Sequence, residues 1–301
     1  MVKEGKDIDS FLLLLQNSNY CRNTYLSFEY YSVLAKYKKP KYFLYLYVEK
    51  LNQTIGILPL EKRKIGYVIY GYRFSNYLGY ICKESDVEEV DKEITEYLSI
   101  KRKNIIIKYY DINTSDKLYN LLINDKFSKG LYLYDCPSCK VTEEFNYLFQ
   151  KAIPNSKKRT ELKKFERKLE MLGKIDVIHI DTLELWEKWK YIFPSLVEVH
   201  RNRFSRIYIS PDLCFHQNAE YYSKMFESLV VERKAYLSIL LLDNVAISFL
   251  YAVVSDGIIM DWMPAFDPAF SKYNLGTVHL MKIFKYVCEN ERYRIFDFSK
   301  G

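Results

Sequence analysis

The sequence is poor in glycine and proline and has no long apolar run near its start. Its 301 residues include 10 Gly and 8 Pro, whereas 49% are hydrophobic and 28% are charged. This composition excludes collagen-like and disordered chains and indicates a folded protein long enough for two domains. The apolar run 11–15 is too short for a signal peptide or a membrane span. We therefore expect a soluble, cytoplasmic protein without a membrane span.

Cysteine usage gives no sign of a disulfide framework. The six cysteines have no regular spacing in a chain of this size, which is typical of a reducing compartment. Cys136 and Cys139 have the spacing of half a zinc site, but no further pair of ligands follows them closely in the sequence. We therefore expect no metal.

Positive charge is not concentrated in a tail. The formal net charge of +7 is spread over both halves of the chain, so bulk charge does not predict a DNA partner. One segment differs, because residues 156–168 contain seven Lys or Arg and two Glu. Apolar residues at 162, 165, 169 and 172 predict an amphipathic helix there. Its basic face is either an ordinary solvated surface or the border of a cleft that attracts an anionic cofactor or polymer.

Tyrosine and phenylalanine are abundant, at 29 and 18 residues, and indicate a strand-rich core. Alternating and β-branched runs predict a strand meander, a helix and a final strand in the C-terminal half: 236–242, 245–254, 258–263, a helix through 278–288, and 295–298. The N-terminal half repeats this order: 42–49, 55–60, 65–70, a helix over 87–100, and 105–110. We therefore predict an α+β protein with two similar units, residues 1–150 and 151–301.

The run MDWMPAFDPAFSKYNLG, residues 260–276, leads from a strand into a helix start. A helix start presents unpaired N–H groups and the positive end of the helix dipole, which suits a phosphate. Lys272 adds charge, Gly276 permits close approach to the backbone, and Thr277 offers a hydroxyl. This segment is therefore a candidate phosphate site.

The corresponding helix start of the first half is acidic. Residues 83–89 contain Glu84, Asp86, Glu88 and Glu89, which suit the helix dipole but repel a pyrophosphate. We expect the second unit alone to bind the anion, and the first unit to be structural or to bind the acceptor.

Several of these motifs resemble one family. The run 273–277, the following helix and FDFSKG at 296–301 are similar to the C-terminal signature of the CelD-like, cellulose-biosynthesis-associated group of GNAT acyltransferases. Residues 57–60, 75–79 and 198–204 and the basic helix also agree with this group, so the resemblance extends from about Tyr42 to the end.

The resemblance implies two GNAT-like units, each a mixed, mainly antiparallel twisted sheet flanked by helices. It implies transfer of an acyl group from acyl-CoA to an amine or hydroxyl acceptor, such as a cell-envelope saccharide or peptide precursor. The residues expected to bind acyl-CoA are Trp262, Met263, Lys272, Tyr273, Asn274, Leu275, Gly276 and Thr277. Those expected at the acceptor side are Tyr77, Arg159 and Arg203.

Such chemistry needs a base and a group that polarises the thioester carbonyl. We expect the polarising N–H from the strand around 261–263, where an irregularity before Pro264 would open the ladder. His200 is the first candidate base, because an ordinary histidine pKa lies closest to neutrality. Asp261, Asp267 and Asp297 are further candidates, and each would need a raised pKa.

Relatives in this group continue beyond the position of Gly301, so we expect the second unit to be short of its last strands, and the general acid stays unassigned. One alternative within the fold is a Fem-like transferase that takes its aminoacyl group from tRNA. Such enzymes carry a two-helix charged arm, whereas one basic helix is predicted here. A second alternative is a non-catalytic binding module for an envelope polymer or a partner protein.

Overall fold

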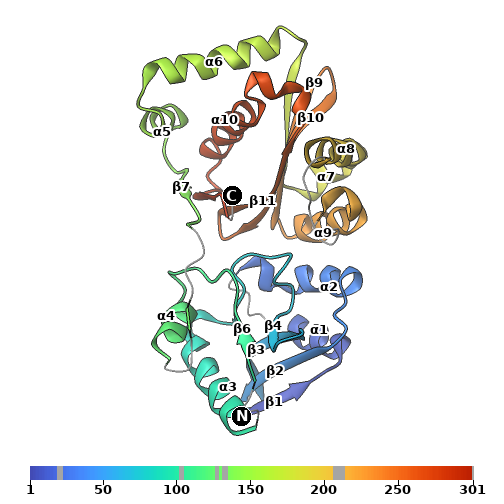
Figure 1. Cartoon of the computed structure of the whole chain (residues 1–301), viewed down its shortest axis with the longest axis vertical. Coiled ribbons are helices and arrows are strands. Elements are labelled where there is room, and N and C mark those ends of the chain that lie inside the picture. Colours follow the sequence, from blue (N-terminus) through green and yellow to red (C-terminus); the bar gives the residue numbers. More distant parts are fainter. Residues whose placement is uncertain (19–22, 102–104, 126–128, 131–134, 206–213, 300–301) are drawn as a thin grey trace. The chain divides into compact units, whose positions relative to one another are not determined.

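The computed structural model describes residues 1–18, 23–101, 105–125, 129–130, 135–205 and 214–299, which form two units (Figure 1). Each unit is a six-stranded mixed sheet flanked by helices, as predicted. The units divide after Leu133 rather than after Gln150. The reason is that strand β7 (Ser138–Lys140) pairs with β12 (Ile295–Asp297) of the second unit.

The first unit has strand order β1-β2-β3-β4-β6, with β5 paired to β3. Its strands are β1 (Val2–Gly5), β2 (Phe43–Lys50), β3 (Gln53–Lys62), β4 (Tyr67–Ile69), β5 (Ile81–Cys82) and β6 (Ile107–Lys108). Its helices are α1 (Ile8–Gln16), α2 (Phe28–Tyr37), α3 (Val87–Lys101) and α4 (Lys117–Asn124), with short 3-10 turns η1 (Thr24–Leu26) and η2 (Glu84–Asp86). Helices α1 and α2 lie on one side of the sheet and α3 and α4 on the other (Figure 1).

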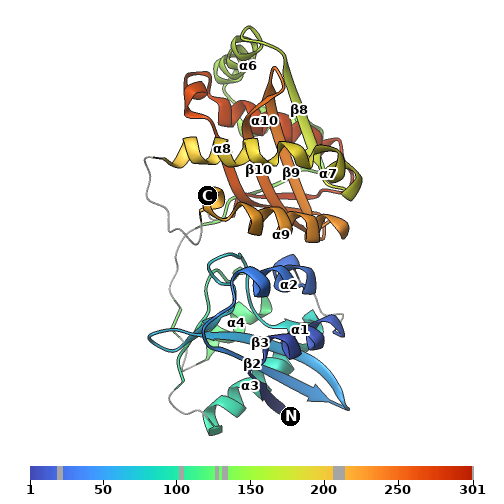
Figure 2. The ribbon, with the colours of Figure 1, turned by 90° about the vertical axis from the view of Figure 1, so that its right-hand side faces the viewer.

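The second unit has strand order β7-β12-β11-β10-β9-β8. Its remaining strands are β8 (Ile175–Ile180), β9 (Ala235–Leu242), β10 (Val245–Ser255) and β11 (Ile258–Phe266). Its helices are α5 (Phe145–Ala152), α6 (Ser156–Glu170), α7 (Leu183–Trp189), α8 (Phe193–Phe204), α9 (Ala219–Val231) and α10 (Leu275–Cys288), with 3-10 turns η3 (Lys190–Ile192), η5 (Phe215–Gln217) and η6 (Pro268–Tyr273). Figure 2 shows α8 and α9 across one face of β9 and β10, with α10 behind the sheet. No helix among the described residues has both the length and the apolar character needed to cross a bilayer.

The predicted repeat of element order is confirmed. In each unit a three-strand antiparallel meander is followed by a helix and by a strand that pairs in parallel with the third strand. Tight turns make the meanders, and Asp243 and Asn244 have φ values of 48° and 66°. Two successive left-handed residues match the twist of a hairpin, which explains the polar pair at this position.

The edge of the second sheet beside β12 is covered by β7. Residues 138–140 pair antiparallel with 295–297, and the Phe298 N–H donates to the Pro137 carbonyl at 2.9 Å. The family resemblance predicts that this sheet is short of its last strands. Here a segment that precedes the unit's other strands supplies the edge partner and satisfies backbone groups that would otherwise stay unpaired.

The predicted basic helix is α6, and its apolar side joins the core that surrounds the start of α10. Leu169 is fully buried in a cluster with Leu275 and Val278 of α10, and Phe165 packs against the same cluster. Lys282 of α10 also forms an ion pair with Glu166 at 2.6 Å. The helix is therefore amphipathic, as predicted, and is attached to the element that carries the candidate anion site.

A buried histidine joins α10 to the sheet. His279 Nδ1 lies 2.8 Å from Ser248 Oγ, and Nε2 lies 2.9 Å from Ser238 Oγ. The Ser248 hydroxyl donates to the Ala265 carbonyl at 3.1 Å, so it accepts from Nδ1–H while Nε2 accepts from Ser238. Burial lowers the pKa of His279 to about 3. The network therefore holds α10 in place only while this imidazole is neutral.

This network predicts a pH dependence of stability. The pKa of His279 in the fold lies below its unfolded value of about 6.5, so unfolding takes up a proton, and stability that is present above pH 6.5 is lost as the pH falls. Between pH 6.5 and 5, the unfolding free energy of the native protein should fall by about 1–2 kcal/mol more than that of His279→Gln. Urea unfolding measures this difference. Lys285→Gln, at an exposed position of the same helix, should follow the native protein, and identical slopes for all three proteins would contradict the assignment.

Candidate functional site

The predicted anion site is an open pocket at the start of α10. Its lining comes from the end of β11, from η6 and from the first two turns of the helix. The lining residues are Phe266, Ser271, Asn274, Leu275, Gly276, Thr277 and Leu280. Four of the residues expected to bind acyl-CoA are therefore brought together around one hollow.

The backbone N–H groups at this helix start can donate hydrogen bonds to a ligand. Asn274 adopts a left-handed conformation with φ 50°, and its side chain does not cap the helix N–H groups. Its Oδ1 instead accepts from Thr277 Oγ1 at 2.9 Å. The first N–H groups of a helix have no partner within the helix, so those of Leu275 and Gly276 are available to a ligand. A Cβ atom at Gly276 would meet the Phe266 ring at 3.5 Å, so a methyl group fits there but a larger side chain would enter the pocket.

Positive charge lies close to this pocket. Lys272 is exposed on η6, with its ammonium 5.1 Å from the partly buried Tyr273 ring. The Arg203 guanidinium lies 4.4 Å from the ring of Phe266, which forms part of the pocket lining. The basic helix α6 packs against α10 through its apolar side. Lys272 of η6 and Arg203 of α8 therefore lie near a helix start whose dipole is also positive.

One acid near the pocket, Asp267, is engaged in local structure. Its Oδ1 accepts from the Ala269 N–H at 2.9 Å and caps η6, and its Oδ2 accepts from Asn202 Nδ2 at 3.3 Å. Asp267 therefore connects η6 to α8, and we do not retain it among the candidate bases.

The corresponding helix start of the first unit has the opposite character. Turn η2 carries Glu84 and Asp86, and Glu88 and Glu89 lie in the first turn of α3. Glu89 forms an ion pair with Lys50 at 2.8 Å. Both structure and charge therefore favour anion binding by the second unit.

The predicted irregularity is present in β11. Tyr251 of β10 pairs with Met263 and Ala252 pairs with Asp261, so Trp262 is the extra residue of a β-bulge. The Trp262 ring packs edge-on against Tyr222 at 5.3 Å and Tyr251 at 5.1 Å, which anchors the bulge. A bulge removes backbone groups from the ladder, so an N–H near Trp262 can face a ligand.

The other edge of β11 opens at the same level. The parallel pairing with β12 ends at Met260 and Asp297, whereas β11 continues to Phe266. Beyond Met260, this edge has no strand partner among the described residues. Where two paired strands separate in this way, the backbone at their C-terminal ends is open between them.

Two carboxyl groups, Asp261 and Asp297, lie where the strands separate. The Asp261 Oδ1 atom is shielded from solvent and has no hydrogen-bond partner within the described part of the chain. Burial, and second the charge of Asp297, raise the pKa of Asp261 to about 7. Asp297 is buried, and its Oδ1 accepts from the Ser299 N–H at 2.7 Å. Asp261 therefore has the raised pKa that an aspartate base needs.

His200 is placed differently from a typical general base. Its side chain is 1% exposed, and its Nδ1 lies 3.1 Å from Nδ1 of His216. Burial, and second His216, lower the pKa of His200 to about 4. Phe204 and Phe215 pack against the ring at 4.5 and 5.4 Å. A shielded imidazole of low basicity is a weaker candidate for the base than Asp261.

The remaining predicted acceptor residues make structural contacts. Arg159 donates through Nη1 to the carbonyls of Ile153 and Pro154, at 2.6 and 2.8 Å, at the start of α6. Tyr77 lies in the first unit with φ 55°, and its carbonyl accepts from Asn23 Nδ2 at 2.9 Å. These contacts neither support nor oppose a role in acceptor binding.

Three pocket residues and one residue beside the carboxyl pair were not predicted from the sequence. Phe266, Ser271 and Leu280 line the pocket, and Ser299 orients Asp297. Ser271 lies in the run 260–276 that was singled out as an anion site, and Ser299 lies in the motif 296–301, which was an available signal. Lys300 and Gly301 of the second motif lie outside the described residues.

The comparisons with known proteins agree with this fold. Residues 156–301 match the family model described as an acetyltransferase (GNAT) domain. The match supports the predicted acyltransferase class, whereas the CelD-like grouping stays a prediction. The search of curated proteins found no match.

Three solved structures resemble nearly the whole chain. L-PGS from Bacillus licheniformis has a TM-score of 0.59 and 13% identity, over 97% of this chain and 75% of that one. FemX has a TM-score of 0.57 and 12% identity, over 99% and 89%. The C-terminal domain of a putative lysylphosphatidylglycerol synthetase from Agrobacterium fabrum has a TM-score of 0.55 and 9% identity, over 97% and 78%. At these identities the likeness concerns the fold alone.

The carboxyl pair yields a prediction for the pKa of Asp261. Asp297→Asn removes the neighbouring negative charge and keeps the oxygen that accepts from Ser299, so the pKa of Asp261 should fall from about 7 toward its ordinary value. A ¹³C NMR titration of aspartate carboxyl carbons measures the change. Asp176→Asn removes an exposed charge of β8 and should leave this pKa unaltered. An unchanged value in Asp297→Asn would show that the two carboxyl groups do not interact.

Proposed function

We propose that the protein transfers an acyl group from acyl-CoA to an amine or hydroxyl acceptor, and that the second unit binds the acyl-CoA. The observation that carries the proposal is the pocket at the start of α10, whose wall is formed in part by β11. The same strand carries the bulge at Trp262 and the carboxyl group of Asp261. An anion site, a distorted strand and a base with a near-neutral pKa are thus supplied by one continuous segment.

Recognition of acyl-CoA follows from the chemistry of its pyrophosphate. The N–H groups of Leu275 and Gly276 and the hydroxyl of Thr277 donate hydrogen bonds to phosphate oxygens. Lys272 and Arg203 add charge beside them, and charge-assisted hydrogen bonds are the stronger kind. Tyr273 and Asn274 hold the loop that presents these groups. Trp262 and Met263 of β11 would contact the pantetheine arm.

The transfer step requires two functions of the protein. An N–H at the bulge donates to the thioester oxygen as negative charge develops on it. Asp261 accepts the proton of the attacking amine or hydroxyl, because a pKa of about 7 leaves much of the carboxyl ionised at neutral pH while keeping it basic. Burial, and second the charge of Asp297, maintain that pKa. The bond from the acceptor to the acyl carbon forms, and the carbon–sulfur bond breaks to release the CoA thiolate.

The first unit is assigned a structural or acceptor-binding role, since its acidic helix start opposes a phosphate. Tyr77 of this unit and Arg159 of α6 remain our candidates for acceptor contacts. A cell-envelope saccharide or peptide precursor is the acceptor class that the family resemblance suggests.

A second candidate function is transfer of an aminoacyl group from tRNA, as in Fem-like enzymes. Two observations favour it: the fold extends over nearly the whole chain in common with FemX, and the exposed side of α6 is strongly basic. A polyanion bound on α6 would depend steeply on salt. If the donor were aminoacyl-tRNA, it would carry no pyrophosphate for the pocket at α10 to bind.

Substitution at Gly276 tests the proposed cofactor site. Gly276→Asp places a side chain and a negative charge in the pocket and should abolish acyl-CoA binding by isothermal titration calorimetry. Gly276→Ala is the matched control, because a methyl group meets Phe266 only at ordinary contact distance, and it should bind within a few-fold of the native protein. If the native protein binds no acyl-CoA but binds tRNA in a salt-sensitive way, the proposed acyl-CoA site is wrong and the Fem-like function is favoured.

Substitution at Asp261 tests the base. Asp261→Asn should lower the turnover number by about 10²–10⁴ and leave acyl-CoA affinity nearly unchanged, because the carboxyl group acts on the acceptor proton. Thiol release from acyl-CoA, followed over a panel of amines and hydroxyl compounds, measures the rate. Asp176→Asn should retain full activity. A weakened affinity with an unchanged turnover number would assign Asp261 to binding instead.

A further inference from the structure

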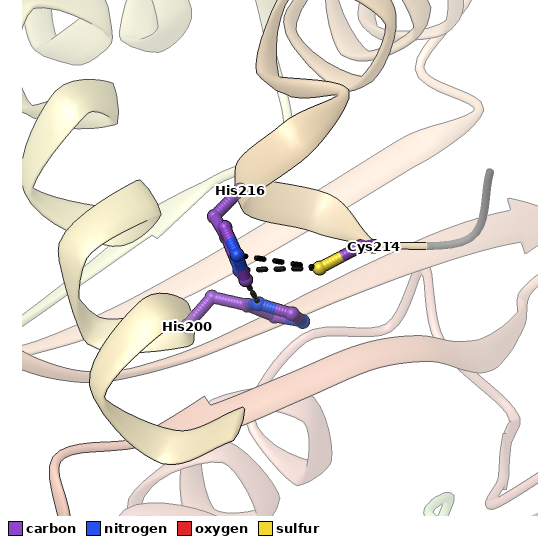
Figure 3. A group of neighbouring side chains, drawn as sticks. All are labelled: His200, Cys214 and His216. Carbon is purple, nitrogen blue, oxygen red and sulfur yellow. Dashed lines mark hydrogen bonds between the residues drawn. The ribbon is translucent and has the colours of Figure 1, made fainter. Parts of the chain in front are cut away.

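Three potential metal ligands converge in the second unit outside the proposed acyl-CoA site. His200 lies on α8, whereas Cys214 and His216 lie at the start of η5 and within it (Figure 3). Their ligand atoms all lie within 4.8 Å of one another. Figure 3 shows the His216 ring between the Cys214 thiol and the His200 ring, with a hydrogen bond on each side.

Two of the three ligand-atom distances are close to those of a tetrahedral site, and the third is at most 4.8 Å. His200 Nδ1 lies 3.1 Å from His216 Nδ1, which lies 3.2 Å from Cys214 Sγ. Zinc bonds of about 2.0–2.1 Å to nitrogen and about 2.3 Å to sulfur at tetrahedral angles separate the ligand atoms by roughly 3.4–3.6 Å. An expansion of a few tenths of an ångström would therefore admit an ion.

The three side chains are held by a rigid surrounding. The Cys214 carbonyl accepts from the N–H groups of Gln217 and Asn218 at 3.1 and 3.0 Å, and from Asn218 Nδ2 at 2.8 Å. Phe215, between the two ligands of η5, is fully buried and packs against Phe249 of β10 at 5.2 Å. Preorganised ligands lose little conformational freedom on binding an ion, which favours affinity.

We propose that His200, Cys214 and His216 bind one zinc ion. Two imidazoles and a thiolate are a borderline-soft donor set that suits zinc, and three protein ligands leave a fourth position for water or an exogenous group. The ion crosslinks α8 to η5. Since α8 also carries Asn202 and Arg203, which contact Asp267 and Phe266, the ion stabilises the helix that borders the proposed pocket.

The sequence pattern alone did not indicate this site. The expectation of no metal rested on Cys136 and Cys139. They have the spacing of half a zinc site, but two further ligands are missing nearby in the sequence. His200 is distant from the Cys214-x-His216 pair along the chain, and the fold brings them together. The proposal does not depend on acyl transfer, because it concerns ion binding by the protein itself.

Metal analysis of the purified protein tests the proposal. After zinc loading and gel filtration, the native protein should retain one zinc per chain, and Cys214→Ser and His216→Gln should lose it. Cys288→Ser, at a partly buried cysteine of the same unit, is the control and should keep the ion. Zinc retained by both ligand variants, or lost equally by the control, would overturn the proposal. His216 is partly exposed, so His216→Gln is expected to fold, which circular dichroism can verify.

X-ray absorption on the native protein provides a test that needs no variant. The site should show one sulfur at about 2.3 Å and two nitrogens at about 2.0–2.1 Å. Two or more sulfur ligands would place the ion at other cysteines, such as Cys136 and Cys139, and would overturn the assignment. Failure of the native protein to retain zinc above the level of Cys214→Ser would do the same.

Discussion

The separation of β11 from β12 is the constraint on which the candidate site depends. Their parallel pairing ends at Met260 and Asp297, and the bulge at Trp262 bends β11 immediately afterward. Beyond Met260 this edge of the strand has no strand partner among the described residues, and the shielded carboxyl of Asp261 lies directly after the last pair. The continuation of the same strand leads through η6 to the start of α10. Strand geometry therefore positions both the proposed chemistry and the proposed anion site.

The position of α10 is fixed from both sides by buried interactions. His279 joins it to Ser238 and Ser248 of the sheet, and Leu275 and Val278 pack against Leu169 of the basic helix. A helix start gains value as an anion site when it cannot move away from its ligand, because less ordering is then required on binding. The two similar units differ at this point in charge rather than in element order: the start of α3 carries four acids, and Lys272 and Arg203 lie near the start of α10.

The order and type of the predicted strands and helices could largely be inferred from the sequence. Hairpin turns such as Asp243-Asn244 and the 3.6-residue periodicity of α6 and α10 are local signals. Strands β7 and β8 were missed, because three residues in a linker and a half-buried run after α6 carry little periodicity of their own. Four of the seven pocket residues, 274–277, were predicted from one continuous segment of the sequence. The coupling of Asp261 to Asp297 and the meeting of His200 with Cys214 and His216 could not be predicted, because those pairs are joined only by the fold. The burial that lowers the basicity of His200 and raises that of Asp261 is likewise a tertiary property.

The central claim is that the start of α10, and not that of α3, holds the pyrophosphate of acyl-CoA. The most direct measurement is an NMR titration of the ¹⁵N-labelled protein with CoA, followed at the backbone amides of both helix starts. The account predicts saturable shifts at Leu275, Gly276 and Thr277, with the amides of Val87, Glu88 and Glu89 unmoved. Shifts confined to the start of α3, or no shift at either helix start at saturating CoA, would contradict it.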